Sequence, residues 1–99
     1  MANEAVKVLA KITAQHGKVE ELKSLLLGLV GPTRAEKGCI SYQLLQNKTD
    51  RSHFVSVEEW TSNAAIAEHM ATSHVQDALS KVHSLLACVP DIDRYVMIG

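Results

Sequence analysis

The sequence is poor in aromatic residues, with one Trp, one Phe and two Tyr among 99 residues. It has no apolar run close to the roughly 20 residues that a membrane-spanning helix needs. Its formal net charge of -1 predicts no basic surface for nucleic acid. The first residues lack both the basic start and the apolar core of a signal peptide. We therefore expect a cytoplasmic protein that binds neither nucleic acid nor membranes.

Cysteine is also scarce. Cys39 and Cys88 are the two cysteines, and the sequence has no Cys-x-x-Cys pair. This excludes the usual redox and structural-zinc motifs, and we expect both thiols to be reduced and buried. The remaining composition, 46% hydrophobic and 21% charged, is that of an ordinary globular protein. A chain of this size forms one domain, so residues 1–99 are assigned to a single unit.

Four segments are predicted to be strands, and the first three alternate apolar and polar side chains with the period of a pleated chain. They span residues 5–13, 39–46, 53–60 and 92–98. A polar run at 47–52 predicts a turn between the second and third strands. One face of the third strand carries four side chains of mixed character: Phe54, Ser56, Glu58 and Trp60.

Apolar residues three and four apart predict helices between these strands. The first helix is expected over residues 18–37, and the Gly-Pro pair at 31–32 should kink or interrupt it. Ser62 is a predicted cap of a short helix. Ser73 opens a capping box for a further helix whose apolar stripe continues to Leu86.

The resulting element order, β-α-β-β-α-β, predicts an α+β fold of the ferredoxin-like type, an antiparallel four-stranded sheet with both helices on one face. The second face of the sheet is then uncovered, although Val, Leu and Ile occupy both faces of several strands. An uncovered apolar sheet is an aggregation hazard in a monomer. Because a two-fold axis pairs one patch with itself, we expect a homodimer.

Titratable and ring side chains are concentrated in the third strand and the helices after it. His69 lies at the margin of an apolar stripe, where it is either a base in a pocket or a histidine satisfied by a carboxylate such as Glu58. Glu58, if buried, is expected to pair with Arg34 or a histidine. Trp60 needs an acceptor for its N–H. Five positions separate His69 from His74, which is not one-face helix spacing, so a metal pair on one helix is disfavoured and His74 is interpreted as fixing a helix start; no metal ligand is expected.

Several motifs together resemble those of a known family. In order, they are Thr33-Arg34-Ala35-Glu36-Lys37-Gly38-Cys39, then Tyr42, Glu58-Glu59-Trp60, His69 and Thr72-Ser73-His74. With these motifs the sequence resembles the antibiotic biosynthesis monooxygenase (ABM) superfamily, and within it the small quinol-monooxygenase-like proteins. The resemblance covers nearly the whole chain. It implies a dimeric α/β barrel built from ferredoxin-like protomers.

The resemblance also implies a reaction. Family members that oxidise aromatic polyketides or quinols use molecular oxygen without metal or flavin, because an electron-rich phenolate can itself reduce oxygen. The protein supplies a dry pocket and a base, and histidine suits the role of base. The expected catalytic residues are His69, Trp60 and Glu58, with no metal ligand. The expected contacts to a small aromatic or quinol-like substrate are Tyr42, Phe54 and His74.

The chain departs from the better-known members of this family. The Asn that polyketide-oxidising members place four residues before their Trp is Ser56 here, and their later Tyr and Arg fall on Ile66 and Ser80. The pattern of the haem-degrading members is absent as well, so haem degradation is not expected. Two alternatives to a monooxygenase therefore stay open. One is a non-catalytic dimeric module that binds a small ligand, and the other is an isomerase or lyase of a small metabolite.

Overall fold

The structure, a computed structural model, describes residues 5–99. In chain order its elements are β1 (Val6–Thr13), α1 (Val19–Arg34), β2 (Cys39–Gln46), β3 (His53–Trp60), α2 (Asn63–Met70), α3 (Ser73–Val82), the short 3-10 helix η1 (His83–Leu85) and β4 (Asp91–Tyr95). Both helices predicted after the third strand are present, as α2 and α3. The predicted ferredoxin-like α+β fold is confirmed.

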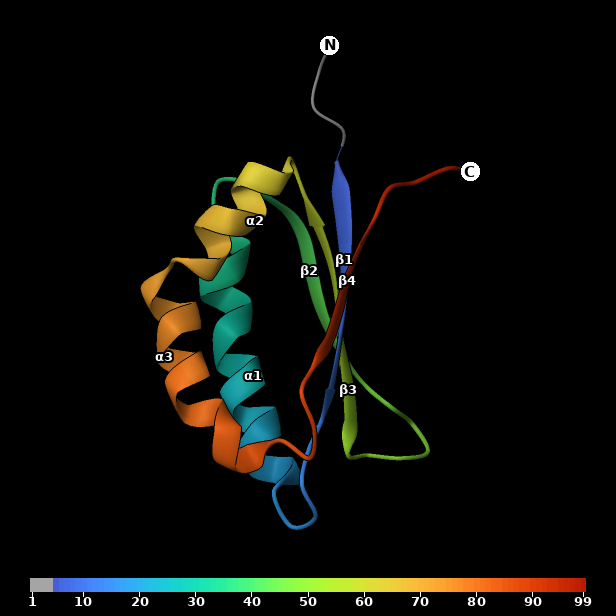
Figure 1. Ribbon diagram of the computed structural model, residues 1–99, viewed down its shortest axis with the longest axis vertical. Coiled ribbons are helices and arrows are strands. Elements are labelled where there is room, and N and C mark those ends of the chain that lie inside the picture. Colours follow the sequence, from blue (N-terminus) through green and yellow to red (C-terminus); the bar gives the residue numbers. More distant parts are fainter. Residues whose placement is uncertain (1–4) are drawn as a thin grey trace.

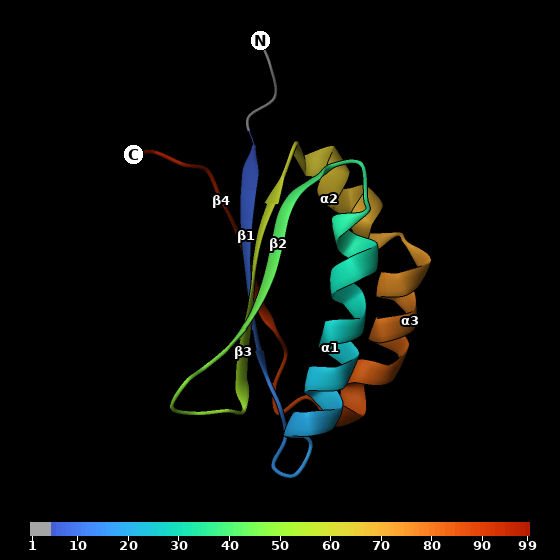
Figure 2. The same ribbon diagram turned by 180° about the vertical axis from the view of Figure 1, so that it is seen from behind.

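The four strands form one antiparallel sheet in the order β2-β3-β1-β4. α1, α2 and α3 all lie against one face of this sheet, and in the described chain no helix covers the other face (Figures 1 and 2). The alternation along β1 buries Val6, Val8 and Ala10 under the helices, whereas Lys7 and Leu9 face the open side. The sheet therefore has one covered face and one open face, as predicted.

The register of the sheet brings polar and aromatic side chains of β2 and β3 together. Glu58 of β3 lies opposite Val8 of β1 on one side and opposite Tyr42 of β2 on the other. Directly opposed residues of antiparallel strands point to the same face. Glu58 and Tyr42 thus point to the helix side with Trp60, two positions along β3, and all three are buried.

The core between sheet and helices consists of two hydrophobic clusters. The cluster under α2 contains Val6, Val8, Trp60, Ala65 and Ile66. The cluster under the N-terminal half of α1 contains Ala14, Leu22, Leu26, Phe54 and Leu85. Trp60 and Phe54, the two largest fully buried side chains, therefore lie in different clusters although both come from β3.

α1 is not interrupted where the sequence predicted. It continues through Gly31 and Pro32 and ends at Arg34, rather than near Lys37. The proline lies in the last turn, so its missing N–H removes one intrahelical bond close to an end where the ladder stops in any case. α1 therefore continues for less than one turn beyond Gly31 before it ends.

The start and end of α3 also differ from the prediction. The cap is Thr72, whose hydroxyl accepts from the backbone N–H of Val75, and Ser73 is the first helical residue. Both residue types suit a cap, and the sequence alone did not separate the two neighbours. α3 ends at Val82 and passes into η1, whereas the prediction carried the helix to Leu86.

Three further expectations concern single residues and the last strand. Ser62 caps α2 as predicted, because its hydroxyl accepts from the backbone N–H of Ala65. The last strand is shorter than predicted and ends at Tyr95. Both thiols are free, but Cys39 is only half-buried and Cys88 is exposed, so the expectation that Cys88 is buried is wrong. It lies in the connection between η1 and β4, and connections usually run over the surface.

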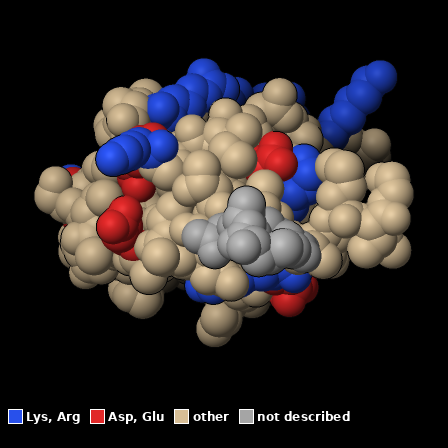
Figure 3. Space-filling view, turned by 90° about the horizontal axis from the view of Figure 1, so that it is seen from above, with Lys and Arg blue, Asp and Glu red and all other residues tan. Residues whose placement is uncertain are grey.

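None of the helices within residues 5–99 is long and apolar enough to cross a lipid bilayer. Seen from above, the visible surface mixes basic, acidic and uncharged side chains, without a large area of one sign (Figure 3). This face therefore lacks the basic stripe that is typical of a site for polyanions.

Gly38 allows the loop after α1 to pack directly against the start of α2. A Cβ at this position would overlap the Cβ of Ala65 and would lie 3.3 Å from Thr61 Oγ1. The Gly38 carbonyl also accepts from the backbone N–H of Thr61 at 2.9 Å. This close approach holds the loop, and with it Glu36, against α2.

We expect Gly38→Ala to lower the free energy of unfolding by about 1–3 kcal/mol, because two methyl groups cannot occupy the same space. Chemical denaturation followed by Trp60 fluorescence measures the change. Gly28→Ala is the matched control, since nothing lies within 4 Å of the added Cβ in the middle of α1. It should be neutral or stabilise the fold by up to about 1 kcal/mol. Equal stability of Gly38→Ala and the wild type would contradict the close packing.

Candidate functional site

Three segments of the chain bring Glu36, His69 and His74 together. Glu36 lies in the turn after α1, where its N–H donates to the Thr33 carbonyl. His69 lies in the last turn of α2, and His74 is the second residue of α3. The nitrogen and oxygen atoms that the three side chains offer lie within 4.8 Å of one another.

The corner between α2 and α3 fixes the two histidines. The Thr72 hydroxyl donates to the backbone carbonyl of His69 at 2.7 Å and accepts from the N–H of Val75. One side chain therefore closes the end of α2 and begins α3. The spacing argument disfavoured a His69–His74 metal pair on one helix. The two residues lie on different helices, so that argument does not apply to the pair seen here.

One oxygen of Glu36 contacts both histidines. Oε2 lies 2.6 Å from His69 Nδ1 and 2.7 Å from His74 Nε2, and the three side chains are only 10–22% exposed. An ionised carboxylate can only accept hydrogen bonds, so both ring nitrogens donate to it. His69 therefore carries a proton on Nδ1. Within residues 5–99, its Nε2 makes no hydrogen bond, which leaves a lone pair on that nitrogen in the neutral form.

The other side of His69 faces aromatic rings. Its ring centroid lies 4.5 Å from that of Trp60, with the planes tilted by 39°, and 6.4 Å from that of Tyr42. The aromatic wall limits the contact of the imidazole with water, and the interaction of the ring with the Glu36 carboxylate is stronger where water is excluded. A planar substrate ring could contact the same wall.

Glu58 belongs to a separate hydrogen-bonded group. Its Oε2 accepts from the Ser56 hydroxyl at 2.6 Å and its Oε1 accepts from Trp60 Nε1 at 2.9 Å. The expectation that Glu58 pairs with Arg34 or a histidine is therefore wrong. Arg34 instead donates through Nε to the backbone carbonyl of Tyr42 at 2.9 Å. The indole N–H of Trp60, which was expected to need an acceptor, donates to Glu58, two residues away on the same strand.

Tyr42 and Cys39 both keep their protons near neutral pH. Burial, and next the Glu58 carboxylate, raise the pKa of Tyr42 well above its ordinary value. Burial, followed by Glu36 and Glu58, raises the pKa of the Cys39 thiol. Tyr42 is therefore a neutral phenol that can donate a hydrogen bond, and Cys39 is a thiol rather than a nucleophilic thiolate.

The structure groups most, but not all, of the predicted site residues. His69, Trp60, Tyr42 and His74 lie together, with Glu58 beside Trp60. Phe54 does not join them, because it belongs to the cluster under the N-terminal half of α1. Sequence reasoning placed Glu36 in a family motif but gave it no role. Its partners are 33 and 38 positions away, so no local pattern indicates them.

Two cavities border this group. One of about 320 Å³ lies along the edge strand β2 and is lined by Arg34, Cys39, Ile40, Ser41, Tyr42 and Gln43. A smaller one of about 140 Å³ lies between α1 and α3 and is lined by Leu25, Gly28, Leu29, His74, Asp77 and Ala78. The first gives a ligand access to Tyr42, and the second reaches His74 from the helix side.

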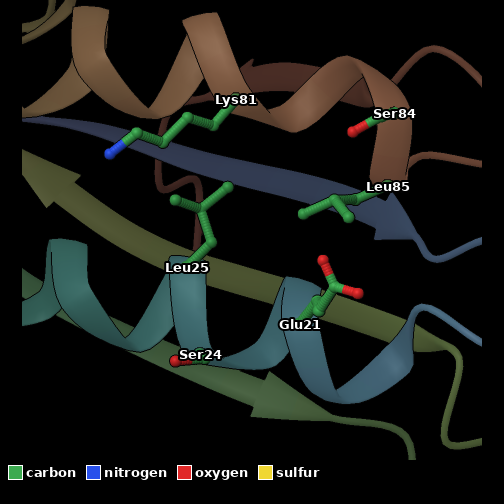
Figure 4. Close-up of a pocket in the computed structure, with 6 residues that line it drawn as sticks. All are labelled: Glu21, Ser24, Leu25, Lys81, Ser84 and Leu85. Atoms are coloured by element: carbon green, nitrogen blue, oxygen red, sulfur yellow. The ribbon is translucent and has the colours of Figure 1, made fainter.

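A further cavity of about 370 Å³ lies at the other end of α1, where Leu25 and Leu85 face each other across the space between α1 and the end of α3 (Figure 4). Its lining consists of Glu21, Ser24, Leu25, Lys81, Ser84 and Leu85. Glu21 lies near the start of α1 and Glu36 follows its end. This lining has no His, Cys or aromatic side chain, so we do not place the chemistry there.

Comparison with known proteins shows relatives that match most of this chain. The chain is 34% identical over 85 residues to the Bacillus subtilis protein named "Putative monooxygenase YcnE", which covers 86% of this chain and 90% of that protein. It is 31% identical over 94 residues to the Synechocystis protein sll1783, of whose length it spans 64%.

Solved structures agree with the fold. The chain is similar to PA3566 from Pseudomonas aeruginosa, with a TM-score of 0.94 and 32% identity, covering 100% of this chain and 99% of that one. Rv0793 from Mycobacterium tuberculosis has a TM-score of 0.91 and 28% identity, with 97% of both chains covered. The sequence profile of the antibiotic biosynthesis monooxygenase family matches residues 5–81. The chain belongs to the antibiotic biosynthesis monooxygenase (ABM) family.

Proposed function

We propose that this protein is a monooxygenase that oxidises a small quinol or polyphenol with molecular oxygen, without metal or flavin. Membership of the ABM family and the name of the Bacillus relative support the reaction type. The observation that carries the proposal is the hydrogen bond of 2.6 Å between Glu36 and His69 Nδ1. This bond fixes the tautomer of His69, whose ring lies beside those of Trp60 and Tyr42.

In this proposal His69 is the general base. The Glu36 carboxylate holds the proton on Nδ1, so Nε2 presents its lone pair to a phenolic hydroxyl of the substrate. The same carboxylate stabilises the imidazolium that forms when Nε2 takes up that proton. Glu36 is a positioning residue because it acts through His69.

The reaction then needs no redox group of the protein. The phenolate left by proton transfer gives one electron to dioxygen, and the two radicals combine at a ring carbon to form a peroxide. The imidazolium returns its proton to the peroxide, and loss of water with the ring C–H hydrogen leaves a quinone. One oxygen atom ends in the product and the other in water.

Tyr42 and Trp60 support the removal of the substrate proton by His69 in different ways. Tyr42 stays a neutral phenol because its pKa is raised, so it can donate a hydrogen bond to a developing substrate anion. Trp60 is fully buried and locked by Glu58, and its ring forms a fixed wall against His69. We assign Glu58 to holding this wall, because both its oxygens already accept hydrogen bonds.

We expect metal-free protein to consume oxygen with at least one member of a panel of reduced quinols and naphthols. His69→Ala should lower kcat by about 10²–10⁴-fold, the usual contribution of a positioned general base. Oxygen-electrode rates measure both effects. His83→Ala is the matched control, since this exposed histidine lies in η1, away from the group, and its rate should be unchanged.

Two outcomes would contradict this proposal. Full activity in His69→Ala would remove His69 from the mechanism. Turnover of a small metabolite under nitrogen, without oxygen consumption, would instead favour the isomerase or lyase alternative, because a monooxygenase cannot react without its oxidant.

For Glu36→Gln we expect kcat to fall about tenfold or more while KM changes little. The amide can donate as well as accept, so it no longer forces the proton onto Nδ1. Steady-state kinetics at several pH values measures the effect. A change confined to KM would show that Glu36 contributes to binding rather than to the base.

We also propose that the protein is a homodimer that pairs the open sheet faces. This face carries Leu9, Val57 and Leu45, the last about 50% exposed, and the nearby C-terminal segment exposes Met97 and Ile98 by 68% and 97%. Exposed apolar side chains gathered on one face of a sheet are typical of a subunit interface.

Light scattering after size-exclusion chromatography should give twice the mass of the 10.8 kDa chain. Val57→Lys should shift the equilibrium toward monomer, because it places a charge in the centre of the interface. Leu27→Lys, at an exposed apolar position of α1, is the control and should leave the mass unchanged. A wild-type monomer at micromolar concentration would overturn the proposal.

A further inference from the structure

We infer that Glu36, His69 and His74 form a binding site for a divalent ion of the zinc class, and that zinc bound there switches off the base. The regulatory half of this inference rests on the proposed function, whereas the binding half does not. Two imidazoles and one carboxylate are a donor set that suits Zn²⁺.

The geometry fits an ion after side-chain movements of about 1 Å. His69 Nδ1 and His74 Nε2 already lie 2.6 and 2.7 Å from one Glu36 oxygen, and all three donor atoms lie within 4.8 Å of one another. Tetrahedral zinc with bonds near 2.1 Å holds its ligand atoms roughly 3.4 Å apart. The two contacts therefore need to lengthen by less than about 1 Å, and the two ring nitrogens, which lie within 4.8 Å of each other, need to approach by up to about 1.4 Å.

The donors come from three separate segments that the fold holds in place. The Gly38 contact fixes the turn that carries Glu36, and the Thr72 hydroxyl fixes the corner between the two histidines. Sites held by rigid elements need little rearrangement on binding. The ion leaves one coordination position free, as in zinc sites with three protein ligands.

An ion can reach the site from the helix side. The cavity of about 140 Å³ between α1 and α3 is lined by His74 and by Asp77. Lys81 pairs with Asp77 at 3.0 Å, but both side chains are more than half exposed, so this pair is weak and easily opened. A carboxylate at the mouth favours a cation over an anion.

Zinc changes the chemistry of His69 by moving one proton. To bind the ion, Nδ1 must offer its lone pair, so the neutral ring carries its proton on Nε2. Nε2 then becomes a donor and can no longer accept the substrate proton. His74 likewise moves its proton from Nε2 to Nδ1. No redox step is involved, and removal of the ion restores the original tautomers.

Binding is tested without substrate. Chelator-treated protein is titrated with Zn²⁺ in competition with a chromophoric chelator at neutral pH. We expect one ion per chain, and about tenfold or greater weakening in Glu36→Gln and in His74→Ala. His83→Ala and Cys88→Ser are the controls, since both residues are exposed and outside the site, and their affinity should be that of the wild type.

Far-ultraviolet circular dichroism and thermal unfolding of the zinc-free variants show whether they are folded. If His74→Ala does not fold, Glu36→Gln decides, because it keeps the size of the side chain. The binding inference is overturned if the wild type binds no stoichiometric zinc. It is also overturned if affinity falls in Cys88→Ser or His83→Ala but not in a folded site variant.

The regulatory half is tested on a substrate that the wild type turns over. One equivalent of zinc should lower the oxygen-uptake rate about tenfold or more, and excess chelator should restore it. An unchanged rate with zinc shown to be bound would overturn this half. If no substrate of the panel reacts, the proposed function and the regulation both fail, while the titration still decides the binding site.

Discussion

The hydrogen bonds that one Glu36 oxygen accepts from two imidazoles are the interaction on which the site depends. They join the turn after α1, the end of α2 and the start of α3 through a single oxygen atom. A carboxylate so little exposed is costly unless it is paired, and the two donors supply that pairing. Because an ionised carboxylate only accepts, the same contacts dictate which nitrogen of His69 carries the proton.

The fold gives two buried carboxylates different tasks by giving them different partners. Glu58 meets a hydroxyl and an indole N–H from its own strand, and neither partner ionises near neutral pH, so it holds the Trp60 wall. Glu36 meets two histidines, which change protonation or tautomer readily, so it governs acid–base chemistry. Trp60 connects the two groups, since it is bonded to Glu58 and its ring lies against His69.

The sequence predicted the fold well because strand alternation, helix spacing and the Ser62 cap are local signals. It failed at element ends, where two neighbouring residues suit the same cap, as at Thr72, and where the helix ends earlier than its pattern predicted, as in α1. In the site, residue type and family motif indicated His69, Trp60 and Tyr42. They did not indicate Glu36 as the partner of His69, because that contact depends on how the loop after α1 packs under α2 through Gly38.

The central claim is that Glu36 sets His69 as a neutral base with its proton on Nδ1. Long-range proton–nitrogen NMR of the zinc-free protein, with assignments from His69→Ala, reads the protonation of each ring nitrogen directly. We predict that neutral His69 has a protonated Nδ1 and a bare Nε2, and that Glu36→Gln shifts part of the population to the other tautomer. A wild-type His69 with its proton on Nε2 would contradict the account.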